Sequence, residues 1–187
     1  MKQVLPVFIR CLIVVLSLSS TLFAATLIEV PAALDQIFPE KDSVESVKVV
    51  LTPEMIAAIS SRSETAKLTA TVGQEKVFTV AKKGADVIGV ATQATEQGKW
   101  GLIQFLIAIN PKTTKIEDVV VLSYEEKRGK PIARRTFLEQ FIGKGLSDPL
   151  DVNNDIKGVT GATISSKAVT SAVKDALVIY EEVFKKK

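Results

Sequence analysis

The sequence contains no histidine, and its only cysteine is Cys11. Histidine is the commonest general base and metal ligand, so its absence excludes Ser-His-Asp and Cys-His catalytic sites. Because Cys11 lies in an apolar N-terminal segment, the rest of the chain has no disulfide, no zinc site built from cysteine or histidine, and no iron–sulfur cysteines. Redox chemistry in this protein would therefore have to come from a bound cofactor.

The chain also lacks a strong excess of charge. It has 24 Lys and Arg residues against 21 Asp and Glu residues among 187 in total. Setting aside Lys2 and Arg10, which belong to the N-terminal segment, brings this balance close to neutral. Nucleic-acid-binding domains normally carry a strongly basic face, so we expect no nucleic-acid partner. The length suits one domain of ordinary size behind a short leader.

Residues 1–25 have the pattern of a signal peptide or a membrane anchor, with Lys2 before an apolar run. Cleavage after Ala24 or Ala25 would leave the large residues Leu22 or Phe23 where small ones are preferred. An uncleaved anchor over residues 11–28 is the alternative, since about 17–25 apolar residues span a bilayer. Both alternatives place the folded domain outside the cytoplasmic membrane, in the periplasm or tethered to the inner membrane.

The period of the apolar residues predicts an α+β fold: an antiparallel β-meander packed against a long C-terminal helix, with a helical N-terminal segment. Residues 26–66 form that segment, with short helices starting near Pro31 and Pro53. Residues 67–187 form the main domain. Its expected strands are 68–72, 77–81, 87–95, 101–109 and 116–124, separated by short turns. A short helix is expected over 136–141, and a long one from about Ser165 to Phe184 with a continuous apolar stripe.

One segment stands out at the start of the long helix, where Thr160-Gly161-Ala162-Thr163 is followed by Ser165, Ser166 and Lys167. Unpaired backbone N–H groups and the positive end of the dipole make a helix start a ready anion site. On this interpretation, the segment would bind a phosphate or a carboxylate. The alternative is a glycine-containing loop and a serine cap before a surface helix.

From Asp155 to Lys167 the sequence resembles the motif of the bacterial FMN-binding domain family, Asp-x-x-x-x-Thr-Gly-Ala-Thr-x-Ser-Ser. That family includes flavin subunits of Rnf-type and sodium-translocating NADH:quinone reductase complexes, and small exported flavoproteins. The resemblance implies that FMN is joined through its phosphate to Thr163, with Thr160, Gly161 and Ala162 completing the motif. It also implies that a separate FMN transferase installs the flavin outside the cytoplasm. Asp155 corresponds to an upstream acid of the family.

Two further blocks support the resemblance. Residues 124–129 resemble the Tyr-x-Glu-x-Arg-Gly segment of small exported members, and residues 137–144 resemble their Phe-Leu-x-Gln-Phe-x-Gly-Lys. Other branches carry Glu-Thr-Pro-Gly where this chain has residues 126–129, which favours the smaller relatives over the core Rnf and sodium-pump subunits.

The resemblance implies a flavin-binding role for each polar residue, and each also has a simpler structural interpretation. Ser165, Ser166 and Lys167 would surround the flavin phosphate, or else cap the helix and form a solvated face. Glu126, Arg128 and Gly129 would reach the flavin after the last strand, or else form an ion pair and a turn. Trp100 and Tyr124 would stack on the flavin ring, or else belong to the core. Arg134 and Arg135 look like a solvated face.

The resemblance therefore implies an exported electron carrier with covalent FMN. It would pass electrons between redox partner proteins, among them a membrane electron-transport complex. Two alternatives stay open: a flavin-dependent reductase of a small acceptor, and an accessory or sensory module that binds FMN without catalysis. No residue is predicted to be catalytic and no metal site is expected.

Overall fold

The computed structural model describes residues 25–63, 71–99, 101–124 and 130–185. A six-stranded antiparallel sheet in the order β1-β6-β5-β4-β3-β2 organises these residues. Its strands are β1 (Ala25–Thr26), β2 (Ser43–Val50), β3 (Glu75–Lys83), β4 (Asp86–Gln97), β5 (Leu102–Asn110) and β6 (Lys115–Tyr124). The helices are α1 (Val30–Ile37), α2 (Pro53–Arg62), α4 (Arg135–Leu138) and α5 (Thr163–Phe184), with 3₁₀ turns at Lys130–Ala133 and Glu139–Phe141. The expected α+β fold with its long C-terminal helix is confirmed.

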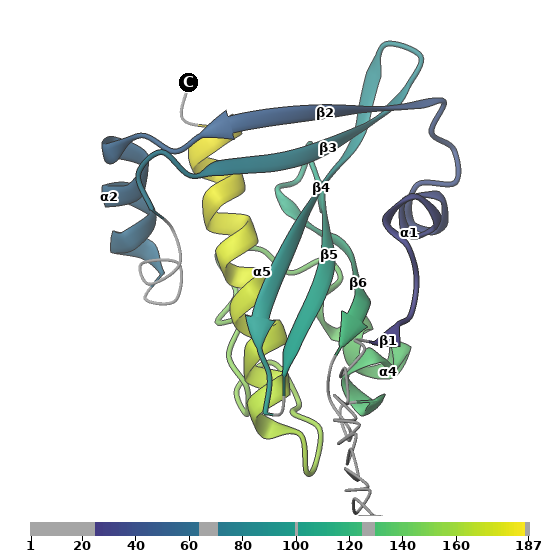
Figure 1. The fold of residues 1–187 in the computed structure, drawn as a ribbon, viewed down its shortest axis with the longest axis vertical. Helices are drawn as coiled ribbons and strands as arrows, with labels where there is room; N and C mark the ends of the chain where they lie inside the picture. Colours follow the sequence, from purple (N-terminus) through teal and green to yellow (C-terminus); the bar gives the residue numbers. More distant parts are fainter. Residues whose placement is uncertain (1–24, 64–70, 100, 125–129, 186–187) are drawn as a thin grey trace, which may run out of the picture.

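Both faces of the sheet are covered (Figure 1). One face packs against α5, whose apolar stripe includes Val169, Val173 and Leu177, all fully buried. The other face packs against α1, which contacts β5 and β6, and Ala33, Leu34 and Phe38 form a second core there with residues of β3 to β6. Apolar side chains on alternate positions of the central strands thus serve two separate cores.

The N-terminal segment differs from the expectation in one respect. Its two helices are present, and Thr52 caps α2 by accepting a hydrogen bond from the Met55 N–H at 3.3 Å. Between them lies β2, a strand that the sequence did not predict, which pairs with β3 over its whole length. Only Val47 and Val49 of this edge strand pack against the core, so its apolar pattern is weak.

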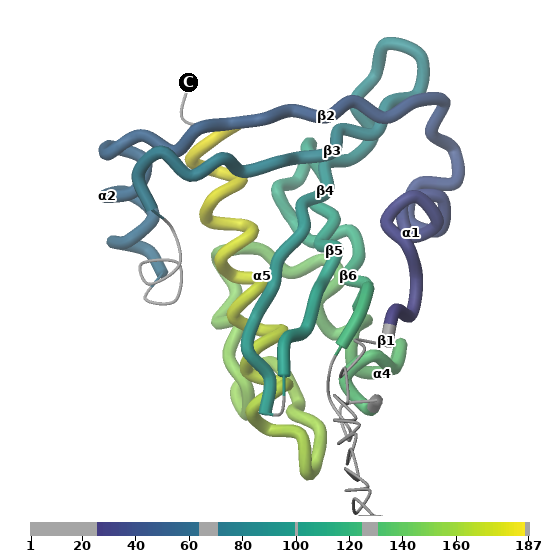
Figure 2. The backbone as a smooth tube through the Cα atoms, viewed as in Figure 1, coloured from purple at the N-terminus to yellow at the C-terminus, as the bar shows by residue number. Residues whose placement is uncertain are grey.

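The four strands expected from residue 77 to residue 124 are confirmed as β3 to β6. Most of the strand expected at 68–72 falls on residues 64–70, outside the described ranges, and Thr71 and Val72 do not lie in a strand. The chain trace in Figure 2 shows β2 and β3 running on from the β4-β5-β6 group at a clear angle. Within the described ranges, no helix is long and apolar enough to cross a membrane.

Gly89 of β4 is a point of close approach between the sheet and α1. A Cβ atom at this position would lie 2.1 Å from the Phe38 ring, which is itself 4% exposed. We expect Gly89→Ala to lower the free energy of unfolding by about 1–3 kcal/mol, since overpacking forces the ring or the strand to move. Urea unfolding measures the change.

The matched control for this prediction is the same substitution in a Phe38→Leu background, where the smaller side chain leaves room. The cost of the alanine should shrink there. An equal cost in both backgrounds would show that the ring contact is not its origin.

Candidate functional site

The candidate site is the turn that leads into α5. Gly161 has a φ of 79°, a left-handed conformation that glycine adopts without strain. The helix follows at once, with Ala162 at the N-cap position and Thr163 as its first residue, two residues earlier than the sequence predicted. Thr160, Gly161 and Thr163 are exposed, while Ala162 is buried beneath them.

Among the described residues, no side chain caps the start of α5. Ala162 has no side-chain oxygen that could accept a hydrogen bond from an amide of the first turn. Serine, threonine, aspartate and asparagine usually fill that position in proteins. With alanine instead, the amide groups and the positive end of a 22-residue helix face outward beside the Thr163 hydroxyl. This arrangement suits an anion attached at Thr163.

The two serines of the motif are buried under this turn. Ser165 is 1% exposed and Ser166 is fully buried. The Ser166 hydroxyl accepts a hydrogen bond from the Val159 N–H at 3.0 Å and donates one to the Ala162 carbonyl at 3.0 Å. It therefore ties the incoming loop to the first turn of α5. This hydroxyl positions the turn from below rather than facing outward with Thr163.

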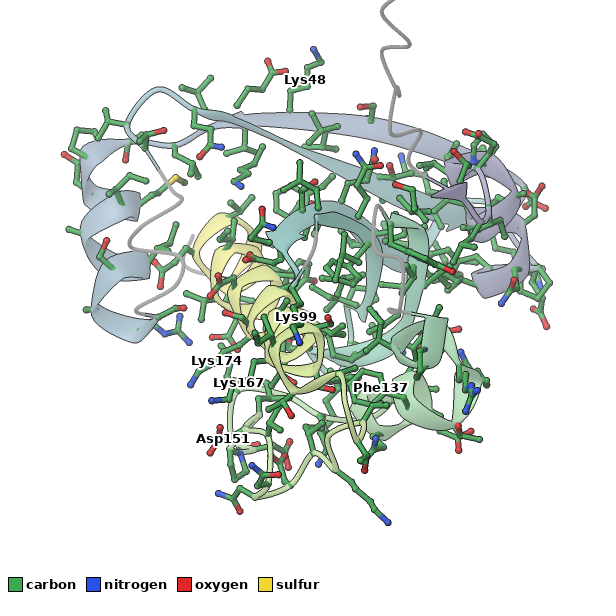
Figure 3. All side chains as sticks on the ribbon, turned by 60° about the horizontal axis from the view of Figure 1, so that its bottom comes forward. Lys48, Lys99, Phe137, Asp151, Lys167 and Lys174 are labelled. Carbon is green, nitrogen blue, oxygen red and sulfur yellow. The ribbon has the colours of Figure 1, made fainter. Side chains whose placement is uncertain are left out.

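Lys167 directly follows the two serines of the motif, and it is exposed. It stands four residues after Thr163, so both side chains emerge on the same face of the helix. Figure 3 looks onto this end of the molecule and shows Lys167 and Lys174 on one side of α5 and Phe137 on the other. Lys167 thus places a positive charge on one side of the site.

Asp155 braces the loop before the motif. Its carboxylate accepts a hydrogen bond from the Asp151 N–H at 2.9 Å and pairs with the Lys144 ammonium at 2.9 Å. Burial raises the pKa of Asp155, but the hydrogen bond and Lys144 together outweigh burial and leave that pKa below its ordinary value. The structure thus places this acid behind the turn, as a support for the loop.

A groove that the sequence did not predict runs beside the turn. It has a volume of about 300 Å³, and it lies between the α4 region and the residues just before the motif. Gln140 joins its walls: its side chain accepts a hydrogen bond from the Lys157 N–H at 2.9 Å and donates one to the Lys157 carbonyl at 3.3 Å. Its lining residues are Pro131, Arg134, Thr136, Phe137, Gln140, Lys157, Gly158 and Val159.

Within the groove, Arg134 and Lys157 bring two further cations near the motif. Arg134 was expected on a solvated face, and it is exposed but lines the groove. Its neighbour Arg135 instead pairs with Asp118 of β6 at 2.5 Å. The sequence signal for this groove was limited to the 137–144 block, which contains Gln140.

Several predicted site residues lie outside the described residues, namely Glu126, Arg128, Gly129 and Trp100. Tyr124 is 5% exposed and belongs to the main core, which agrees with the simpler of its two predicted roles. Among the described residues, no group of three or more acidic side chains is arranged to hold a metal ion.

A second cluster of charged groups lies far from this turn, between α5 and the strands β3 and β4. Lys76, Glu96 and Asp175 all line one cavity. Burial and the charge of Asp175 raise the pKa of Glu96 to about 7, although Lys76 acts in the opposite direction. Burial likewise lowers the pKa of Lys76 despite the two nearby carboxylates.

Residues 98–178 match the FMN-binding domain family. The chain is similar to one component of the proton-translocating ferredoxin:NAD(+) oxidoreductase complex of Clostridium ljungdahlii, with 35% identity over 57% of this chain and 60% of the relative. It is also similar to one component of the Na(+)-translocating ferredoxin:NAD(+) oxidoreductase complex of Acetobacterium woodii, with 28% identity over 64% of each chain. The alignments thus span less than two thirds of these curated relatives.

Two solved structures share the fold at 17% sequence identity. Shewanella oneidensis NqrC aligns with a TM-score of 0.51, over 79% of this chain and 87% of that one. One component of the Na(+)-translocating NADH-quinone reductase of Parabacteroides distasonis aligns with a TM-score of 0.56, over 83% of this chain and 84% of that one. Each alignment extends well beyond residues 98–178, so the shared fold includes much of the N-terminal half.

The lowered pKa of Asp155 predicts how the stability of the fold depends on pH. Because its folded pKa lies below the ordinary 3.8, its ionised form stabilises the fold above about pH 4, and this contribution disappears as the pH falls further. Asp155→Asn should cost about 1–2 kcal/mol at pH 7 and almost nothing at pH 3. Urea unfolding at both pH values tests this. Asp151→Asn, an exposed side chain in the same loop, is the control and should change little.

Glu96 should show the opposite dependence. Its folded pKa of about 7 exceeds the ordinary 4.5, so the folded state loses stability as the pH rises between these values. Glu96→Gln should therefore be more stable than the wild type by about 1–2 kcal/mol at pH 8, after allowing for solvent screening. That gain should vanish near pH 4. Glu139→Gln, at an exposed position, should show no such trend, and a pH-independent gain for Glu96→Gln would contradict the prediction.

Proposed function

Because residues 98–178 belong to the FMN-binding domain family, we propose that this chain is an exported electron-transfer flavoprotein with FMN phosphoester-linked to Thr163. The observation that carries the assignment is the start of α5. The exposed residue Thr163 stands there as the first residue of a long helix that no side chain of the described residues caps. A phosphate on this hydroxyl would meet the positive end of the helix dipole.

Thr163 fits the attachment better than Thr160 does. Both hydroxyl groups are exposed, but Thr160 precedes the Gly161 turn and lies outside the helix. An anion on Thr163 would lie beside the first-turn amides and on the helix face that carries Lys167. Ser166 holds the turn in place through Val159 and Ala162, and so keeps that hydroxyl at the helix start.

The rest of the flavin would extend from Thr163 toward the groove. Phe137 and Val159 offer apolar contact there, and Arg134 and Lys157 offer positive charge. When bound, FMN supplies one- and two-electron transfer, which no side chain of this chain provides. Positive charge beside the flavin favours its reduced, more negative forms.

Attachment requires a separate enzyme in this proposal. A threonine hydroxyl is a weak nucleophile without an adjacent base, and the sequence contains no histidine to act as one. We therefore propose an FMN transferase as the maturation partner. We place this attachment outside the cytoplasm, in the periplasm or at the membrane surface, and the signal-peptide or anchor pattern of residues 1–25 supports that placement.

The redox partners are proposed to belong to a membrane electron-transport complex. The two curated relatives are named as components of ferredoxin:NAD(+) oxidoreductase complexes that move protons or Na⁺. Their likeness covers only part of each relative, so the partnership proposed for this chain is with a complex of that general kind. A covalent flavin suits an exported carrier, because the cofactor cannot be lost to the medium between two encounters.

The attachment is tested by expressing the full chain together with an FMN transferase. The wild type should show flavin fluorescence in a denaturing gel, and Thr163→Ala should lose it. Thr160→Ala is the matched control and should keep the label, because its hydroxyl is not the acceptor. Thr163→Ser should keep part of it, since a hydroxyl remains. Labelling of Thr163→Ala at the wild-type level would refute the attachment site.

A second measurement separates a carrier from an enzyme. The flavinylated chain, reduced under anaerobic conditions, should pass its electrons to a protein acceptor such as a cytochrome without turning over small acceptors. Steady turnover of a small acceptor by the isolated chain would instead support a flavin-dependent reductase.

A further inference from the structure

The sheet divides into two branches where β3 and β4 part. Their pairing ends at Phe78 and Thr92. Beyond this point, Glu75–Val77 continue to pair with β2, while Gln93–Gln97 pair with β5. Figure 1 shows the result: β2 and β3 turn away from β4 and β5. The helix α5 lies behind both branches. In this fork, the facing edges of β3 and β4 no longer form hydrogen bonds with each other.

A cavity of about 290 Å³ occupies this fork. On the helix side, Ala172, Ala176 and Ile179 of α5 form an apolar surface beside Asp175, and Phe78 adds an aromatic surface. The five consecutive residues 92–96 of β4 line the opposite wall, so the edge of the strand faces the cavity. The space therefore combines an apolar surface with the hydrogen-bonding groups of a strand edge.

Opposite charges line the same cavity without pairing. Lys76 lies on β3 and Glu96 on β4, and both are half-buried. Within the described part of the chain, neither side chain makes a hydrogen bond or an ion pair within 4.0 Å. Asp175 of α5 lies near both of them, and its carboxylate accepts a hydrogen bond from the Ser63 hydroxyl. Half-buried charges without partners are costly unless water or a ligand satisfies them.

We propose that this cavity binds a small zwitterion, an α-amino acid with an apolar side chain. Its ammonium group would lie against Glu96, within the field of Asp175, and its carboxylate against Lys76. Its side chain would pack on Phe78 and Ile179. A ligand that carries both charges gives both walls a partner and adds no net charge. A simple amine would leave Lys76 without a partner, and a simple acid would be repelled by the two carboxylates.

The site is separate from the proposed flavin attachment. Asp175 follows Thr163 by twelve residues of one continuous helix, which places them about 18 Å apart along its axis. Amino-acid binding can therefore be measured with or without flavin on the chain. Its success or failure does not depend on the outcome at Thr163.

Isothermal titration calorimetry on the full chain at pH 8 tests the proposal, with L-leucine as the probe. We expect saturable binding with a Kd below about 1 mM. Two half-ligands serve as controls, 4-methylpentanoate for the carboxylate alone and 3-methylbutylamine for the ammonium alone. Each should bind at least about tenfold more weakly, because each loses one charge-assisted contact. N-acetyl-leucine amide, which has neither charge, should bind most weakly.

Variants assign the binding to this cavity. Lys76→Met and Glu96→Gln should each weaken leucine binding by about tenfold or more. Lys112→Met and Glu139→Gln, which change the same residue types at exposed positions, should leave it unchanged. Circular dichroism checks that each variant is folded. The half-ligand series uses only the wild type, so it holds even if a cavity variant fails to fold.

Three results would overturn the proposal. The first is an absence of binding for leucine and for smaller and larger apolar amino acids at about 10 mM, well above the expected Kd. The second is leucine binding of equal strength in folded Lys76→Met and Glu96→Gln. The third is equal binding of N-acetyl-leucine amide and leucine, which would show recognition of the amide backbone by the strand edge instead of a zwitterion.

Discussion

The packing of α5 against one face of the sheet is the constraint on which the other features depend. Its stripe of fully buried residues, with Val169, Val173 and Leu177 among them, fixes both the rotation and the height of the helix. Burying one such side chain contributes roughly 1.5–3 kcal/mol, so a turn or slide of the helix would be costly. The candidate site therefore lies at the end of a rigid element, where its amides and Thr163 keep a fixed direction.

The turn itself depends on a smaller contact. The Ser166 hydroxyl joins the Val159 N–H to the Ala162 carbonyl, and it does so beneath the surface, where water does not compete. Removing it would leave a partly buried N–H without a partner, which typically costs about 1–3 kcal/mol. A serine at this position thus explains how alanine is tolerated as the N-cap: the loop is held from below, and the outward side of the turn stays open for an anion.

The elements that the sequence predicted correctly are those whose burial follows a strict period. The central strands and α5 each bury one face or both, so their apolar spacing reveals them. β2 was missed because it is an edge strand in which only Val47 and Val49 reach the core. The groove beside the turn was missed for another reason. Arg134, Gln140 and Lys157 are brought together by the way two loops fold onto each other, which no local pattern encodes.

The same reasoning explains why the charged cavity left no trace in the sequence. Lys76, Glu96 and Asp175 are unremarkable as single residues, and their neighbours show ordinary strand and helix patterns. They meet because β3 follows β2 into one branch of the sheet while β4 follows β5 into the other. The strand register, which is a property of the whole sheet, opens the space beside Lys76 and Glu96, and Asp175 reaches it from α5. One helix therefore carries the proposed anion site at its start and one wall of the charged cavity halfway along. The two are held in fixed relation by the apolar stripe between them.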